Sequence, residues 1–125
     1  MTRFGIAGVA LFAAMPVLSQ DANMLSRLET GQWELRGANS ARIAAICLGN
    51  PIQLTQPYHR GANCTRDVVA ADAHGMTVSY SCPGIGRGRT ALRFETPRLI
   101  QIESQGLDRG MPFVLRAEAR RTGPC

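Results

Sequence analysis

The histidines, serines and cysteines are the side chains whose types and spacing bear most directly on chemistry in this 125-residue chain. His59 and His74, the two histidines, fall in segments with loop composition, where either could bind a metal or act as a general base. Because loops lie on the surface, we predict that both are solvated and have no such role. The serines lack the G-x-S-x-G setting of a nucleophile, and the cysteines lack the C-x-x-C spacing typical of zinc sites. The sequence therefore predicts no catalytic residue, no metal and no cofactor. A small hydrolase with an unrecognised site is the alternative.

Residues 84–89, Gly-Ile-Gly-Arg-Gly-Arg, have the composition of a phosphate-binding loop. Such loops lead from a strand into a helix, whereas this segment precedes another strand pattern. We therefore interpret it as a wide hairpin connection. Arg87 and Arg89 on this loop are our candidate contacts for an anionic glycan or lipid head group.

The first residues predict an export signal. Arg3 is the only charge before an apolar run at residues 4–17, which is shorter than the ~20 residues of a membrane-spanning helix. Pro16 would end the helix of that run, and small residues follow it, so we predict cleavage after Ser19. Removing 19 residues from 125 leaves a single domain of 106, in the periplasm or secreted. The alternative is an uncleaved membrane anchor; after cleavage we expect no stable membrane insertion.

The mature chain is mildly basic. All fourteen basic residues are arginine, and without Arg3 the balance is 13 positive against 9 negative charges, or +4. Such a charge favours solubility and weak attraction to anionic surfaces. Because aromatic residues are few and the chain is exported, we expect no nucleic-acid partner.

The mature chain alternates apolar and polar residues over most of its length. This pattern predicts about seven short strands with short connections, and such connections permit only an antiparallel meander. We predict a mainly β domain, curled or half-barrel-like, with one apolar face and a short N-terminal helix over residues 21–29. Residues 50–56 are expected to form a turn or short helix, capped by Asn50 with Pro51 at its first position.

The four cysteines of an exported domain predict two disulfides, with three pairings to choose from. A hairpin that turns at residues 72–75 places Val68 opposite Val78 and Ala70 opposite Met76 when Cys64 faces Cys82. The same register places Arg66 beside the Tyr80 ring. We therefore predict a Cys64–Cys82 disulfide. Cys47 and Cys125 then pair by elimination.

A second hairpin is predicted around Pro97. Phe94 and the isoleucines of residues 99–104 must share one face, because a slip of one residue turns every side chain over. We predict Phe94 opposite Ile102 and Arg93 opposite Glu103, with residues 97–99 as the loop.

Several phrases resemble a known family. They are LETGQWELR (28–36), RGANC (60–64), VSYSC (78–82), QIESQG (101–106) and ARRTGPC (119–125). Together they resemble the domain of unknown function 3617 family, in its exported sphingomonad-type form, over nearly the whole mature chain. The resemblance implies a periplasmic domain with four cysteines and transfers no catalytic residue.

We therefore expect a non-enzymatic binding or interaction module of the cell envelope, whose partner is an unidentified envelope component or small ligand. The alternative is a carrier of a small apolar ligand or lipid, because a curled meander can enclose a cavity.

Overall fold

The computed structural model describes residue 5, residues 8–14 and residues 24–125. Residues 5 and 8–14 have no regular secondary structure and are exposed. The predicted cleavage site after Ser19 and the start of the predicted helix lie outside the described residues; of that helix, residues 24–26 are helical. Within the described residues, no helix is long and apolar enough to cross a membrane.

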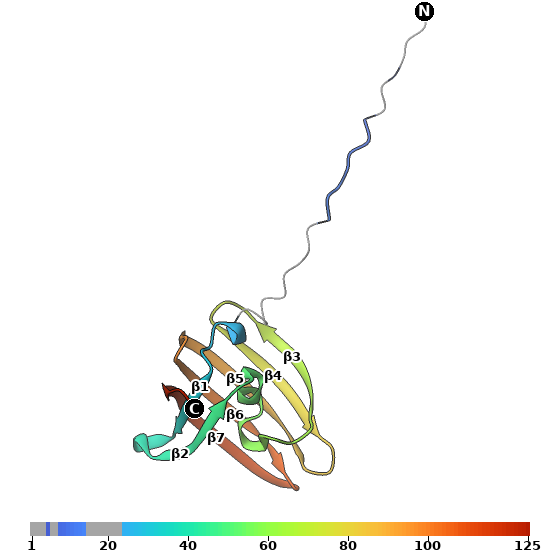
Figure 1. Cartoon of the computed structure of the whole chain (residues 1–125). Coiled ribbons are helices and arrows are strands. Elements are labelled where there is room, and N and C mark those ends of the chain that lie inside the picture. The colour runs from blue at the N-terminus through green and yellow to red at the C-terminus, as the bar shows by residue number, and fades with distance from the viewer. Residues whose placement is uncertain (1–4, 6–7, 15–23) are drawn as a thin grey trace, which may run out of the picture.

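Residues 24–125 form one antiparallel sheet of seven strands, as the sequence predicts, and the sheet is not closed into a barrel (Figure 1). The strands are β1 (Gly31–Arg36), β2 (Arg42–Leu48), β3 (Thr65–Ala71), β4 (Gly75–Cys82), β5 (Gly86–Thr96), β6 (Leu99–Asp108) and β7 (Met111–Gly123). Their order is β2-β1-β7-β6-β5-β4-β3. The last five strands are thus a meander, and the β1–β2 hairpin pairs with β7, so β2 and β3 are the edges.

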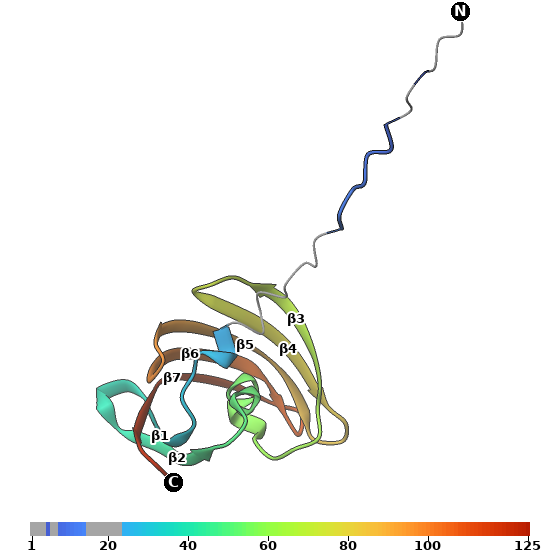
Figure 2. The ribbon, with the colours of Figure 1, turned by 45° about the horizontal axis from the view of Figure 1, so that its top comes forward.

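The sheet curls around its own connecting segments (Figure 2). Three short 3-10 helices, η1 (Ala38–Ser40), η2 (Pro51–Thr55) and η3 (Pro57–His59), complete the element list. The linker between the two edge strands, which contains η2 and η3, lies on the inner face, where Leu54 is fully buried. Asn50 caps η2 as predicted: its side-chain oxygen accepts a hydrogen bond from the backbone N–H of Ile52 at 3.1 Å.

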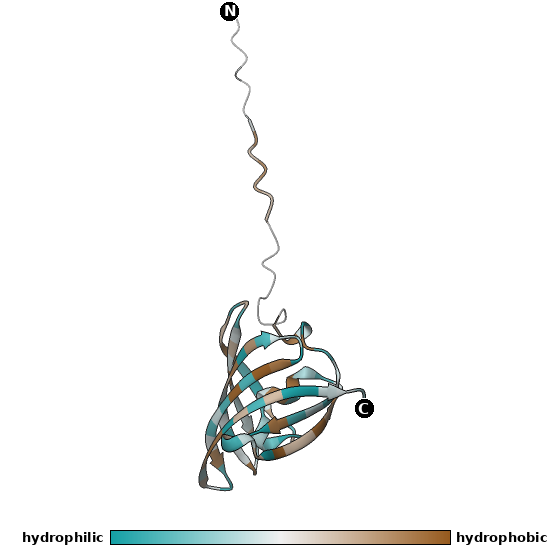
Figure 3. Cartoon of the chain, turned by 90° about the vertical axis from the view of Figure 1, so that its left-hand side faces the viewer, coloured by the Kyte–Doolittle hydropathy of each residue, from teal (hydrophilic) through white to brown (hydrophobic). Residues whose placement is uncertain are grey.

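The core lies between the inner face and these connecting segments, and strands alternate apolar and polar residues along their length (Figure 3). Trp33 is fully buried, and its indole N–H donates to the backbone oxygen of Glu29 at 2.8 Å. The partner of the indole is therefore supplied by the segment that joins the N-terminal helix to β1, which satisfies the one polar atom of the ring.

The β3–β4 hairpin has the predicted register near the disulfide and a different one near the turn. Val68 lies opposite Val78 as predicted, but a bulge after Val68 places Ala70 opposite Thr77 instead of Met76. The turn explains the correction, because the carboxylate of Asp72 accepts hydrogen bonds from two backbone N–H groups and fixes the pairing at that end. One extra residue in β3 absorbs the difference between the two ends.

The predicted pairing of the β5–β6 hairpin is wrong by two residues. Phe94 lies opposite Ile100 rather than Ile102, and Arg93 lies opposite Gln101 rather than Glu103. The turn is shorter than expected, because Thr96 already pairs with Leu99 and a bulge precedes it. A shift of two residues preserves the face of every side chain, so Phe94 still points inward as predicted.

Both predicted disulfides are present: Cys47–Cys125 and Cys64–Cys82. Cys47 lies in edge strand β2, and Cys64 directly precedes edge strand β3. To reach Cys47, the chain end passes the start of β1 at Gly31, whose φ of +139° and proximity to the Gly123 carbonyl exclude a side chain there.

Candidate functional site

Of the two histidines, one is exposed as predicted and the other is buried. His74 is exposed in the β3–β4 turn, as expected. His59, predicted to be solvated, ends η3 and is only 5% exposed. The reason is that η3 belongs to the linker of residues 49–64, which joins the two edge strands and crosses the inner face of the curled sheet. Short 3-10 turns have too little periodicity to reveal this in the sequence.

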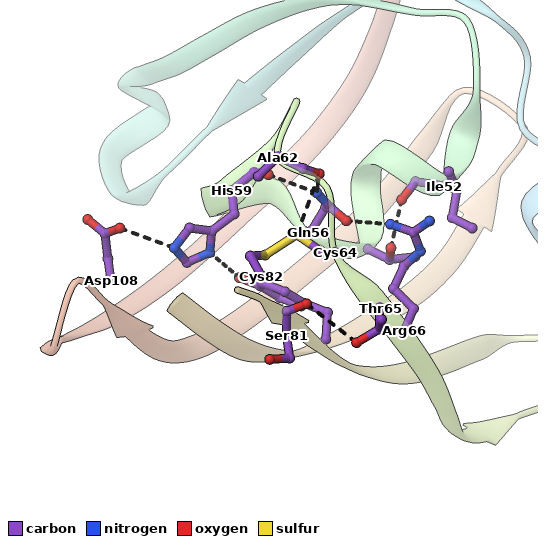
Figure 4. The surroundings of a disulfide bond; sticks show 12 residues. Ile52, Gln56, His59, Ala62, Cys64, Thr65, Arg66, Ser81, Cys82 and Asp108 are labelled. Carbon is purple, nitrogen blue, oxygen red and sulfur yellow. Dashed lines mark hydrogen bonds and ion pairs between the residues drawn. A yellow bond between two sulfur atoms is a disulfide. The ribbon is translucent and has the colours of Figure 1, made fainter. Parts of the chain in front are cut away.

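His59 links a carboxylate to a phenol, and Figure 4 shows its contact with the carboxylate of Asp108. One ring nitrogen, Nδ1, lies 2.7 Å from the Tyr80 hydroxyl, and Nε2 lies 3.2 Å from Oδ1 of Asp108. The Tyr80 hydroxyl also bonds to Ser104, whose own hydroxyl lies 2.8 Å from that of Thr90. Five side chains thus form one chain of polar contacts across the inner face.

Glycines make room for this network. Gly86 and Gly88 in β5 lie opposite Asp108 and Gly106 in β6. A Cβ atom on Gly88 would lie 2.6 Å from the Tyr80 hydroxyl, and one on Gly86 would lie 2.9 Å from Nε2 of His59. Glycines spaced two apart in a strand, each facing inward, are the sequence signal for such a cradle, and here they lie in strand β5 rather than in the predicted loop.

The network is enclosed. Tyr80 is 3% exposed and His59 5%, whereas the Asp108 side chain, which also binds Arg109, is 26% exposed. A histidine between a carboxylate and a phenol could move a proton, but a substrate would reach only the carboxylate end. We therefore assign the network to holding η3 against the sheet.

Arg66 also contributes to this attachment. It faces Tyr80 across the hairpin as predicted, but its guanidinium donates to the side-chain oxygen of Gln56 at 2.5 Å instead of lying on the ring. The Gln56 amide donates in turn to the backbone oxygens of His59 and Ala62, at 2.8 and 3.0 Å (Figure 4). The segment from Gln56 to His59 is thus held at its start by the contacts of Gln56 and at its end by those of His59.

Burial raises the pKa of Tyr80 above its usual 10.0; the negative charge of Asp108 adds to the rise, and the Ser104 hydrogen bond opposes it. Above about pH 10 the unfolded chain loses this proton while the folded protein keeps it, so we expect stability to fall as the pH rises from there towards the folded pKa. In a Tyr58→Phe variant, phenolate absorbance reports Tyr80 alone and should appear only above pH 10. A midpoint below 10 would contradict the enclosed site.

The predicted anion contacts lie elsewhere, on the outer face. Arg87 and Arg89 are exposed in strand β5, not in a loop, because β5 begins at Gly86 and the connection is confined to residues 83–85. Across the sheet, Arg87 lies between Ser81 and Leu107, and Arg89 lies between Ser79 and Gln105. A strand holds these two arginines on the same side, two residues apart, more firmly than a loop would.

These two arginines differ from the others on the outer face. Most of the others pair with a carboxylate close by: Arg36–Glu34, Arg93–Glu95, Arg116–Glu103 and Arg120–Glu118. Arg87 and Arg89 form no ion pair and no side-chain hydrogen bond with any residue that the structure describes. Their positive charges are therefore available to a ligand.

Arg87 and Arg89 line an open groove of about 810 Å³ over β4–β7. Hydroxyl and amide groups of Ser79, Ser81 and Gln105 line it as well, together with apolar side chains of β6 and β7, and no carboxylate is among the lining residues. A smaller, apolar pocket of about 200 Å³ lies on the inner face beside Ile52 and Val68. The described residues contain no cluster of three potential metal ligands.

Comparison of the chain with protein-family models, with curated proteins and with solved structures finds no match. The function is therefore argued from the geometry of the groove and of the inner face.

Proposed function

We propose that this chain is an exported, non-enzymatic binding module of the cell envelope, which holds an anionic component against the outer face of its sheet at Arg87 and Arg89. The observation that carries the proposal is the presence of two unpaired arginines beside hydroxyl and amide groups, in a groove lined by no carboxylate. Guanidinium groups bind phosphate, sulfate and carboxylate oxygens with paired hydrogen bonds. Export is supported by the apolar run behind Arg3 and by the two disulfides.

The inner face supports the carrier alternative less well. The curl of the sheet holds Trp33, Leu54 and the buried network, and the remaining apolar pocket measures about 200 Å³. Typical ligand pockets span roughly 300–1,000 Å³, and a pocket of about 150 Å³ accommodates benzene. A carrier built on this pocket would hold a small apolar molecule rather than a lipid.

The anion-binding proposal predicts a specific loss in the R87Q/R89Q double variant. Heparin serves as a soluble polyanion, and its affinity is measured by titration at low salt. We expect the dissociation constant to rise about tenfold, because each exposed charge pair contributes at most about 1 kcal/mol. The affinity of the wild-type chain should also fall as salt is added.

The matched control is R93Q/R116Q, which removes the same charge from the same face. Arg93 and Arg116 already have carboxylate partners, Glu95 and Glu103. We therefore expect the removal of these two arginines to change heparin affinity by less than about threefold. Equal losses in the two double variants would show that only net charge matters and would refute a defined site.

A further inference from the structure

We infer that the anionic component is the surface of a lipid bilayer, and that Leu107 and Val114 supply an apolar contact beside the two arginines. The inference rests on the proposed anion-binding function and assigns its partner. Val114 is 71% exposed, which is a high value for an apolar side chain within a strand, and the partly exposed Leu107 lines the same groove as the arginines. A soluble anion held by Arg87 and Arg89 would leave both in water.

The strand register places the basic and apolar side chains in common rows. In one row, Arg87 of β5 faces Leu107 of β6, which faces Pro112 of β7. In the next row, Arg89 faces Gln105, which faces Val114. Positive charge on β5 therefore lies two strands away from apolar surface on β7, at one end of the outer face.

The borders of this patch are defined by charge. In the next row along the sheet, Glu103 appears and is paired with Arg116 at 3.1 Å. At the tip of the β6–β7 hairpin, the carboxylate of Asp108 is already bound by His59 and Arg109. On the side of edge strand β3, Asp67 lies opposite Ser79, which itself lies opposite Arg89. Asp67 forms no ion pair with Arg89 and marks the border on that side.

A bilayer that contains anionic lipids matches both halves of the patch. Its head groups carry the phosphate oxygens that guanidinium groups bind, and the interface below them accepts short apolar side chains. Arginines near such a surface and apolar side chains inserted into it contribute independently to binding. Leu107 and Val114 line the same groove as Arg87 and Arg89, so this end of the outer face can enter the interface without any change of fold.

The test is co-sedimentation of the processed, secreted protein with vesicles of phosphatidylglycerol and phosphatidylcholine in equal amounts, compared with phosphatidylcholine alone. Every variant carries the same N terminus, so differences among them report the sheet. We expect the L107S/V114S variant to bind the mixed vesicles about tenfold more weakly and heparin as tightly as the wild type. R87Q/R89Q should lose affinity for both.

The control for lost apolar surface is Val69→Ser, since Val69 is 49% exposed at the far edge of the sheet. It should bind vesicles like the wild type, and thermal melting establishes that each variant is folded. Full vesicle affinity in L107S/V114S, or equal loss of affinity in Val69→Ser, would overturn the inference. Arginine-dependent heparin binding without vesicle binding would overturn it while leaving the proposed function intact, and the absence of both would refute the two together.

Discussion

Replacing Cys47 and Cys125 together by alanine is expected to lower the free energy of unfolding by about 4–5 kcal/mol. The two cysteines are 78 positions apart, so their bond closes a long loop. A bridge removes more conformational entropy from the unfolded chain when the loop that it closes is longer. The whole free energy of unfolding of a domain is about 5–15 kcal/mol, so the variant should unfold at a much lower urea concentration. Urea titration followed by Trp33 fluorescence measures the change.

The matched comparison is the removal of Cys64 and Cys82, which are 18 positions apart and whose bridge is worth about 3 kcal/mol in the same treatment. The single variants Cys47→Ala and Cys125→Ala should cost equal amounts, since each breaks the same bond. If the shorter bridge proves the more stabilising of the two, loop length is not what determines their contributions.

Gly88→Ala is the second substitution for which we expect a large effect. The new Cβ atom would lie 2.6–2.7 Å from the hydroxyl and ring of Tyr80, and that ring is held by its 2.7 Å contact with His59. Overpacking of this kind costs about 1–3 kcal/mol, and losing the hydrogen bond adds about 1 kcal/mol. Chemical denaturation gives the loss of stability, and the NMR signals of the His59 ring report its displacement.

Gly123→Ala is the control, because nothing lies within 4 Å of a Cβ atom there and the change should stay within about 0.5 kcal/mol. Adding Tyr80→Leu to Gly88→Ala removes the ring that the methyl group strikes. The cost of Gly88→Ala should then shrink in the double variant, whereas an unchanged cost would show that the cradle does not depend on the ring.

The disulfides and the antiparallel sheet could be predicted because they depend on side-chain alternation, which is written directly in the sequence. Val68 opposite Val78 and the Cys64–Cys82 bond follow from placing apolar residues on one face. The exact pairing at Phe94 could not be predicted, because it depends on a bulge and a short turn that preserve alternation while shifting register by two. The export signal and the family resemblance stay predictions.

The candidate site was predicted only in part. Arg87 and Arg89 were identified by type, yet their place in a strand and their lack of partners depend on where Glu95 and Glu103 lie in three dimensions. The burial of His59 was missed because the linker that carries it has little periodicity, and its partners Tyr80 and Asp108 are 21 and 49 positions away. Contacts over such separations are set by the curl of the sheet.

The positions of the two disulfides affect how the edge strands of this protein unfold. An open sheet ordinarily frays from its outermost strands, which exchange their amide protons first and can recruit another chain into misfolded fibrils. Here β2 is bonded through Cys47 to the chain end, and the start of β3 is bonded through Cys64 to β4. Peeling off either outer strand is restrained by a covalent bond, so the amide protons that β2 and β3 donate to their neighbours should exchange more slowly while the bonds are intact than after reduction.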